Sequence, residues 1–180
     1  PSLLVNGAGY QGRFVSTPWY PPEDVARVMA VNVTGLMTVT TAIVRRLVDL
    51  GAAGAVVNLA SRAARGSPNT PAYCASKAAV IGFTRAAALD LAPHGIRINS
   101  VSPAFVGPGE MWDRQVHEQA SVPSQYYSDD AAEVEHEMLS KVPMRRLGST
   151  DEVASVVVWL LSDDASYVTG EDVLVSGGVR

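Results

Sequence analysis

The sequence has a single cysteine, Cys74, and only 18% charged residues. One cysteine excludes an intrachain disulfide, so a reducing compartment suits the chain. The longest dense apolar run, 153–161, is too short to cross a bilayer, and no charged-then-apolar leader precedes it. A net charge of −4 gives no reason to expect nucleic acid as a partner. We therefore expect a soluble, cytoplasmic protein that binds neither membranes nor nucleic acid.

Metal-binding patterns are missing as well. His94, His117 and His136 lack the spacing of metal ligands, and the acidic stretch 129–137 is most simply a solvated helix face. The chain does have a hydrophobic content of 47% over 180 residues, enough for a sizeable core. We predict no metal site and a single domain over residues 1–180.

Short apolar runs alternate with longer helical patterns along the chain. We predict buried strands at 3–5, 55–59, 96–101 and 173–175. We predict helices at 23–50, 73–91 and 149–161. This alternation indicates an α/β fold, in which about four parallel strands are covered by helices on both faces. A polar, helical excursion over 110–141 lies inside a segment, about 105–145, that we expect to form a lid.

The most informative pair is Tyr73 and Lys77, at the start of a helical pattern. Residues four apart lie on one face of a helix, so the phenol and the amine can address the same small volume. A free tyrosine, with a pKa of about 10, is a poor base, but a nearby ammonium stabilises the phenolate and lowers that pKa. Taken alone, this spacing is more often found on an ordinary helix surface, so the surrounding residues decide.

Two further polar residues accompany this pair. Ser61 follows a buried strand at its carboxyl end, which is the edge where ligands bind in open parallel sheets. Asn32 lies in the middle of the preceding helical pattern. Each has a simpler interpretation, Ser61 as a turn cap and Asn32 as a helix residue bonded to a backbone carbonyl. Taken together with Tyr73 and Lys77, they favour a catalytic group.

Six segments, in the same order, resemble the short-chain dehydrogenase/reductase family. They are Asn6–Gly9, Val31–Gly35, Val57–Ser61, Tyr73–Lys77, Ile98–Pro103 and Tyr167–Gly178. The resemblance implies a Rossmann-type, doubly wound parallel sheet, represented here by its C-terminal part. That family begins with a strand, a glycine-rich turn and a helix that receives the cofactor pyrophosphate. We expect these to be missing, because the chain begins where the fourth strand of the family would lie.

The resemblance also implies the chemistry: hydride transfer between a nicotinamide cofactor, NAD or NADP, and a secondary alcohol or ketone. Tyr73 would be the general base or acid, Lys77 would lower its pKa and hold the ribose, and Ser61 would bond the substrate oxygen. Asn32 would keep a proton-relay water through its backbone. The implied cofactor contacts are Asn6, Ala8, Gly9, Tyr73, Lys77, Pro103, Ala104 and Val106. The resemblance alone favours NAD, since the residue that selects the cofactor is absent.

Three positions depart from the family pattern. Gly7 stands where a second asparagine is usual, and Ala104 replaces a glycine near the nicotinamide. Pro108 replaces a threonine that often bonds the carboxamide, and it offers neither a hydroxyl nor an N–H, although the amide of Val106 remains. None of these changes touches the proton-transfer residues.

The stretches around Gln11, Trp112 and 122–127 resemble members of the bacterial xylitol dehydrogenase type. This implies a polyol or sugar alcohol as substrate, with Gln11, Ser61, Tyr73 and Trp112 in contact with it. Trp112 is equally well explained as a packing residue of the lid. Two alternatives stay open: a reductase of a cyclic diol or 3-oxoacyl compound, and a truncated, non-catalytic interaction module. Family members pair the helices 23–50 and 73–92 between subunits, so we expect a homotetramer.

Overall fold

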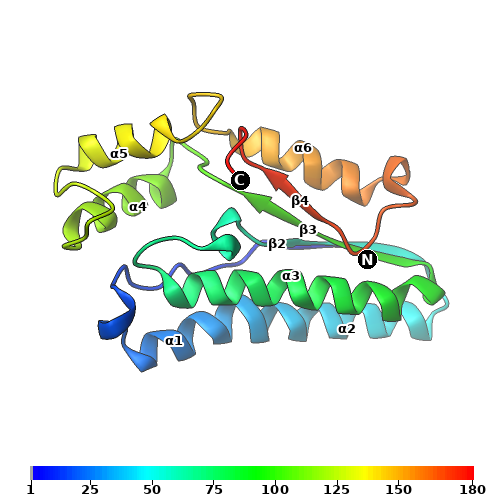
Figure 1. Ribbon diagram of the computed structural model, residues 1–180. Coiled ribbons are helices and arrows are strands. Elements are labelled where there is room, and N and C mark those ends of the chain that lie inside the picture. The colour runs from blue at the N-terminus through cyan, green and yellow to red at the C-terminus, as the bar shows by residue number, and fades with distance from the viewer. Residues whose placement is uncertain (1) are drawn as a thin grey trace.

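In the computed structural model, which describes residues 2–180, a four-stranded parallel sheet is covered by helices on both faces (Figure 1). The strands are β1 (Leu3–Asn6), β2 (Gly54–Leu59), β3 (Ile96–Pro103) and β4 (Asp172–Val175). They lie in sequence order across the sheet, and each neighbouring pair is parallel. Parallel neighbours need a crossover, and the predicted helices supply it. The predicted fold class is confirmed.

One face of the sheet is covered by two long helices that lie side by side (Figure 1). The first is continuous and consists of α1 (Pro22–Met29), a turn of π-helix (Ala30–Gly35) and α2 (Leu36–Asp49). The second is α3 (Pro71–Leu91). Their apolar sides meet the sheet in a core that contains Leu47, Val56, Ala88, Leu91, Ile96 and Ile98.

The opposite face is covered by α6 (Thr150–Leu161) (Figure 1). Its start is fixed by a capping box, in which the Ser149 hydroxyl accepts from the Glu152 amide at 3.1 Å and the Glu152 carboxylate accepts from the Ser149 amide at 2.8 Å. Leu160 packs with Val57 and Val101 of the sheet. β2 is mostly apolar, as expected for a strand that helices cover on both faces. β3 also includes the polar residues Arg97, Asn99, Ser100 and Ser102.

The lid segment, residues 105–145, contains two short helices beside the carboxyl ends of the strands (Figure 1). They are α4 (Glu110–Ser121) and α5 (Ala131–Ser140). The polar excursion expected over 110–141 is therefore interrupted, because Asp130 accepts from the amides of Ala132 and Glu133 and starts a new helix. The two helices have a core of their own, built around Trp112, Val116, Val134 and Met138.

The continuous helix from Pro22 to Asp49 is, by length and composition alone, apolar enough to cross a membrane. The expectation that no segment crosses a bilayer rested on the shorter run 153–161. A helix that passes this test is weak evidence, since packed helices of water-soluble domains pass it too. Here Leu36 and Leu47 are buried against α3 and the sheet. The helix is thus an integral layer of the fold.

Candidate active site

A cavity of about 480 Å³ lies between the carboxyl ends of the strands, the start of α3 and the lid segment. The sequence-predicted site residues that line it are Gly9, Gln11, Ser61, Tyr73, Lys77, Pro103, Ala104, Val106 and Trp112. Asn6, Ala8 and Asn32 do not line it. Side chains far apart in the sequence thus meet at one edge of the sheet, as the topology of parallel strands predicts.

Tyr73 and Lys77 lie on the first two turns of α3. The helix begins at Pro71, whose fixed φ and missing N–H suit the first helical position. One turn separates the two side chains, and the Lys77 Nζ lies 5.6 Å from the centroid of the Tyr73 ring. The spacing of four therefore brings both groups into one volume, as predicted.

Burial dominates the pKa values of this pair. It raises the pKa of Tyr73, and the neighbouring Ser61 hydroxyl only partly offsets the increase. It also lowers the pKa of Lys77 to about 8. We expected the Lys77 ammonium to lower the pKa of the tyrosine, but desolvation of the phenol is the larger effect here. A raised pKa favours the protonated phenol, the form that donates a proton to a ketone oxygen.

Lys77 is 4% exposed, and its ammonium donates to the Leu59 carbonyl at the end of β2, at 2.7 Å. Within residues 2–180 this is its one hydrogen bond, so two of its three N–H donors remain for a ligand. A Cβ at Gly9 would lie 3.5 Å from this Nζ, and the glycine therefore keeps the space in front of the ammonium open. This donor set fits the hydroxyls of a nicotinamide ribose.

Ser61 lies just beyond β2 in an extended conformation. Its Oγ accepts from the Ala63 amide at 3.1 Å and caps the short 3-10 turn Arg62–Arg65. A hydroxyl that accepts one hydrogen bond still has its own O–H and a second lone pair. The turn-cap interpretation and the catalytic one are therefore compatible.

Asn32 is 1% exposed and lies in the π-helical turn. Its Oδ1 accepts from the Tyr10 amide at 2.7 Å, and its Nδ2 donates to the Tyr10 carbonyl and the Ser76 hydroxyl, both at 2.9 Å. Both polar atoms of the side chain are therefore engaged in hydrogen bonds that hold the loop after β1, and Asn32 does not line the cavity. The helix is irregular at Asn32, where one turn is π-helical. The role inferred for its backbone stays a prediction.

Two of the cofactor contacts implied by the resemblance are not brought into the cavity. The Asn6 side chain points inward, and its Nδ2 donates to Thr40 Oγ1 and Asn58 Oδ1, both at 2.8 Å. These bonds tie the end of β1 to α2 and β2 instead. Ala8 also lies outside the cavity, while its neighbours Gly7 and Gly9 line it.

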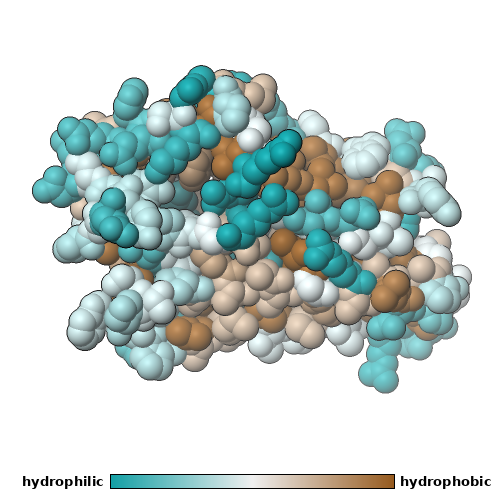
Figure 2. Space-filling model, in the orientation of Figure 1, coloured by the Kyte–Doolittle hydropathy of each residue, from teal (hydrophilic) through white to brown (hydrophobic). Residues whose placement is uncertain are grey.

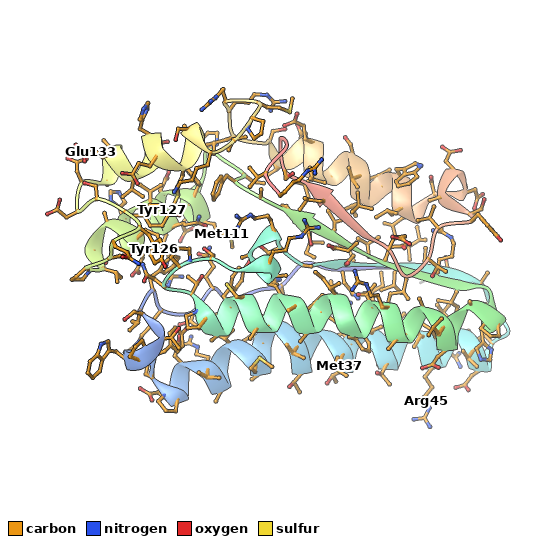
Figure 3. All side chains as sticks on the ribbon, viewed as in Figure 1. Met37, Arg45, Met111, Tyr126, Tyr127 and Glu133 are labelled. Atoms are coloured by element: carbon orange, nitrogen blue, oxygen red, sulfur yellow. The ribbon has the colours of Figure 1, made fainter. Side chains whose placement is uncertain are left out.

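Trp112 forms a wall between the lid core and the cavity. Its ring centroid lies 5.5 Å from that of Phe105, and its indole N–H donates to Glu135 at 3.2 Å. The indole N–H is therefore engaged within the lid, and Trp112 offers the cavity an apolar surface. Met111, Tyr126 and Tyr127 also line the cavity. Figure 3 shows these three side chains in the lid segment.

The hydrogen bonds that join the lid segment to the loops below it were not predicted. Gln119 is 1% exposed, and its Oε1 accepts from Asn69 at 2.8 Å while its Nε2 donates to the Pro68 carbonyl at 3.0 Å. Gln115 accepts from Gln11 at 3.2 Å. The available signal was helical spacing, since Gln115 and Gln119 share one face of α4 with Trp112.

The role of Asp24 was also not predicted, because in the sequence it is an ordinary acidic residue in the first turn of a helix. It is 6% exposed and accepts from the Arg13 amide at 2.8 Å, the Tyr20 hydroxyl at 2.6 Å and the Tyr10 hydroxyl at 3.2 Å. Burial alone would raise the pKa of Asp24, but these hydrogen bonds outweigh it and lower the pKa. The carboxylate thereby fixes the loop that carries Gln11 into the cavity.

The chain is similar to known oxidoreductases over nearly its whole length. Residues 2–180 match a family profile described as enoyl-(acyl carrier protein) reductase. A (3R)-3-hydroxyacyl-CoA dehydrogenase of Rattus norvegicus is 37% identical over 180 residues, which cover 99% of this chain and 63% of the relative. The chain thus spans less than two thirds of the length of that relative.

Solved structures agree with this relationship. A crystal structure of NAD+-bound xylitol dehydrogenase is 48% identical, with a TM-score of 0.96 over 98% of this chain and 68% of the other. An NADP-bound structure from Agrobacterium tumefaciens, proposed to be a 2-deoxy-D-gluconate 3-dehydrogenase, is 31% identical, with a TM-score of 0.84 over 98% of this chain and 66% of the other. The chain belongs to the short-chain dehydrogenase/reductase family.

Proposed function

We propose that this protein, in its full-length form, is an NAD(P)-dependent dehydrogenase of secondary alcohols. In the oxidative direction, an alcohol and the oxidised cofactor would give a ketone, the reduced cofactor and one proton. The observation that carries the proposal is the convergence of Tyr73, Lys77 and Ser61 on one cavity. Each of these residue types has an alternative role, but their meeting at the ligand-binding edge of the sheet favours catalysis.

The three side chains would divide the proton chemistry among them. The Ser61 hydroxyl would hydrogen-bond the substrate oxygen and hold the reacting carbon in place. Tyr73 would take the hydroxyl proton during oxidation, or donate its own proton during ketone reduction. The Lys77 ammonium, close to the tyrosine ring, would stabilise the phenolate while that proton is away. A bound nicotinamide supplies the hydride acceptor or donor.

The residues present fit such a cofactor in part. Lys77 has free N–H donors for the ribose, and Pro103, Ala104 and Val106 line the cavity where a nicotinamide ring would lie. We favour NAD as the cofactor, on the strength of the NAD+-bound relative at 48% identity.

We propose a polyol as the substrate. Gln11 and Gln115 place amide groups in the cavity, where they can bond the hydroxyls of such a molecule. The xylitol dehydrogenase named above supports this substrate class. The apolar faces of Phe14, Met111 and Trp112 would pack against its carbon chain.

The test is a substrate panel on the full-length protein with NAD+ and NADP+, followed by nicotinamide absorbance. Polyols should be oxidised, and NAD+ should be preferred. Oxidation of cyclic alcohols or 3-hydroxyacyl thioesters without polyol turnover would contradict the substrate. Turnover of no alcohol by protein that binds either cofactor would contradict the enzymatic proposal itself.

The exposed faces of α2 and α3 support a further proposal, that the protein is a homotetramer. Met37 and Val39 of α2 are 39% and 46% exposed, and Leu89 of α3 is 79% exposed. Figure 2 shows apolar residues gathered over these helices. Burial of such faces against a second subunit would remove apolar surface from water. Sedimentation velocity would measure the assembly directly.

A further inference from the structure

The cavity is lined by three cationic side chains and, within residues 2–180, by no acidic one. Lys77 belongs to the proton-transfer group described above. Arg62 and Lys141 do not, and they come from opposite sides of the cavity: Arg62 follows Ser61 below the lid, and Lys141 ends α5 within it. A neutral polyol would give these two charges no partner.

Arg62 has an incomplete set of hydrogen bonds. One terminal nitrogen donates to the Gly66 carbonyl at 2.9 Å, which orients the guanidinium. Its Nε is buried and has no hydrogen-bond partner among the described residues. No ion pair involves Arg62 in this part of the chain, since the two that occur join Arg114 to Glu118 and Arg146 to Glu152. The Nε is closed to solvent, but the second terminal nitrogen makes no hydrogen bond within residues 2–180 and can donate to an acceptor in the cavity.

Lys141 also lines the cavity. Its Nζ lies 4.6 Å from the centroid of the Tyr127 ring, a cation–π contact that draws the ammonium toward the lining. Glu137, one turn earlier on α5, does not pair with it and does not line the cavity. A lysine at the end of a helix also suits the helix dipole, but that effect does not require it to line the cavity.

Tyr127 connects the two cations. Burial raises the pKa of Tyr127, while the charge of Arg62 acts against that increase and Glu137 adds to it. Arg62 is therefore close enough to act on the same ring that Lys141 covers. Tyr127 lies in the lid segment with Tyr126 (Figure 3). Arg62, Tyr127 and Lys141 thus all line the cavity, and Arg62 directly follows Ser61 in the chain.

We propose that Arg62 and Lys141 bind an anionic group of the substrate, carried at the end of its hydroxylated carbon chain. This deepens the proposed function, on which it rests: the substrate would be a sugar acid or a phosphorylated sugar alcohol. The guanidinium matches a carboxylate or phosphate with parallel N–H donors, and the ammonium adds a point charge. Since both side chains line the cavity that holds Ser61 and Tyr73, the anion and the reacting carbon belong to one molecule.

The test compares three probes of similar size on the full-length protein: xylonate, xylitol 5-phosphate and neutral xylitol. Dissociation constants come from calorimetry at constant ionic strength, and kcat and KM from nicotinamide absorbance. Arg62→Gln and Lys141→Met should each raise the dissociation constant of xylonate or xylitol 5-phosphate by about tenfold, as expected for a lost charged hydrogen bond. The dissociation constant of xylitol should change by less than about twofold. The probe that is bound more tightly decides between carboxylate and phosphate.

Two controls separate charge recognition from structure. Arg65→Gln removes an exposed arginine of the same 3-10 turn that does not line the cavity, and should leave all three constants unchanged. Lys141→Arg keeps the charge and should keep most of the anion affinity. The proposal is overturned if wild-type protein binds xylitol as tightly as both anions. It is also overturned if Arg62→Gln and Lys141→Met weaken the binding of all three probes equally.

These outcomes are distinct from failure of the proposed function. Turnover of xylitol without any preference for an anion would keep the polyol dehydrogenase and remove the anion site. Anion binding that depends on Arg62, in protein that oxidises no alcohol, would keep the site and remove the dehydrogenase.

Discussion

The two sides of the cavity are held in place by different kinds of contact. On the sheet side, Ser61 and Lys77 are fixed by backbone groups at the end of β2 and in the turn after it. On the lid side, α4 and α5 form a separate core that is tied to the loops below by side-chain hydrogen bonds, such as Gln119 to Asn69. The proposed proton-transfer residues thus rest on regular structure, and the proposed substrate contacts rest on replaceable side chains.

The sharpest way to test this division is Tyr73→Phe, on the sheet side. Loss of the phenol hydroxyl should reduce kcat by about a thousandfold, since it removes the general acid or base. Cofactor binding should be nearly unchanged. The matched variant on the lid side, Tyr127→Phe, should change KM more than kcat. Steady-state kinetics and cofactor titration measure both, and undiminished turnover in Tyr73→Phe would rule out the assignment.

The lid attachment can be broken with Gln119→Met, which keeps the side-chain volume. It would leave the Asn69 amide and the Pro68 carbonyl without their buried partner, at a cost of about 2 kcal/mol. Hydrogen exchange of amides in α4 and α5 should accelerate by about thirtyfold, while those in α3 should not change.

Glu118→Gln provides the control for that variant. It affects an exposed ion pair to Arg114 on the same helix, at 3.5 Å, and such pairs contribute little. If Gln119→Met accelerated hydrogen exchange equally in α3 and α4, the lid segment would not open separately from the sheet.

On the sheet side, the lowered pKa of Lys77 should make the free energy of unfolding depend on pH. Burial lowers the pKa of Lys77 from 10.5 to about 8, so between these values the unfolded chain binds more protons than the folded one. The free energy of unfolding should therefore rise with pH in that window. Relative to Lys77→Met, the wild type should gain about 1.5 kcal/mol between pH 8 and pH 9.5. Denaturant unfolding of both proteins at the two pH values measures this difference, and a constant difference would contradict the lowered pKa.

The smallest expected effect comes from the loop between the two sides. Tyr20→Phe removes one of three hydrogen bonds to Asp24, and the two that remain still satisfy the carboxylate, so the loss should be about 1 kcal/mol. Tyr10→Phe removes the longer bond, 3.2 Å against 2.6 Å, and should cost less. Thermal unfolding ranks the two variants, and the reverse order would show that the loop depends mainly on Tyr10.

Much of the sheet side could be predicted from the sequence. The alternation of apolar runs and helical patterns is sufficient for a parallel α/β fold, because crossovers need helices and buried strands need apolar residues on both faces. Helix periodicity then places Tyr73 next to Lys77, and strand polarity places Ser61 at the same edge. These conclusions depend on local geometry, which neighbouring residues along the chain determine.

The lid side and the charge states required the tertiary structure. Nothing in the chain marks Gln119 or Asp24 as buried, because Gln119 bonds to Asn69 and Asp24 bonds to Arg13, partners 50 and 11 positions away. Asn6 and Asn32 were assigned to the site from the resemblance, yet each spends its amide on other side chains and the loop backbone.

The sequence alone thus determined which groups could exchange a proton, since spacing on a helix and position after a strand are local properties. Only the tertiary structure decided how the pKa values of these groups shift. Residues from several elements bury Lys77 and partly bury Tyr73, and this desolvation raises the pKa of Tyr73 and lowers that of Lys77.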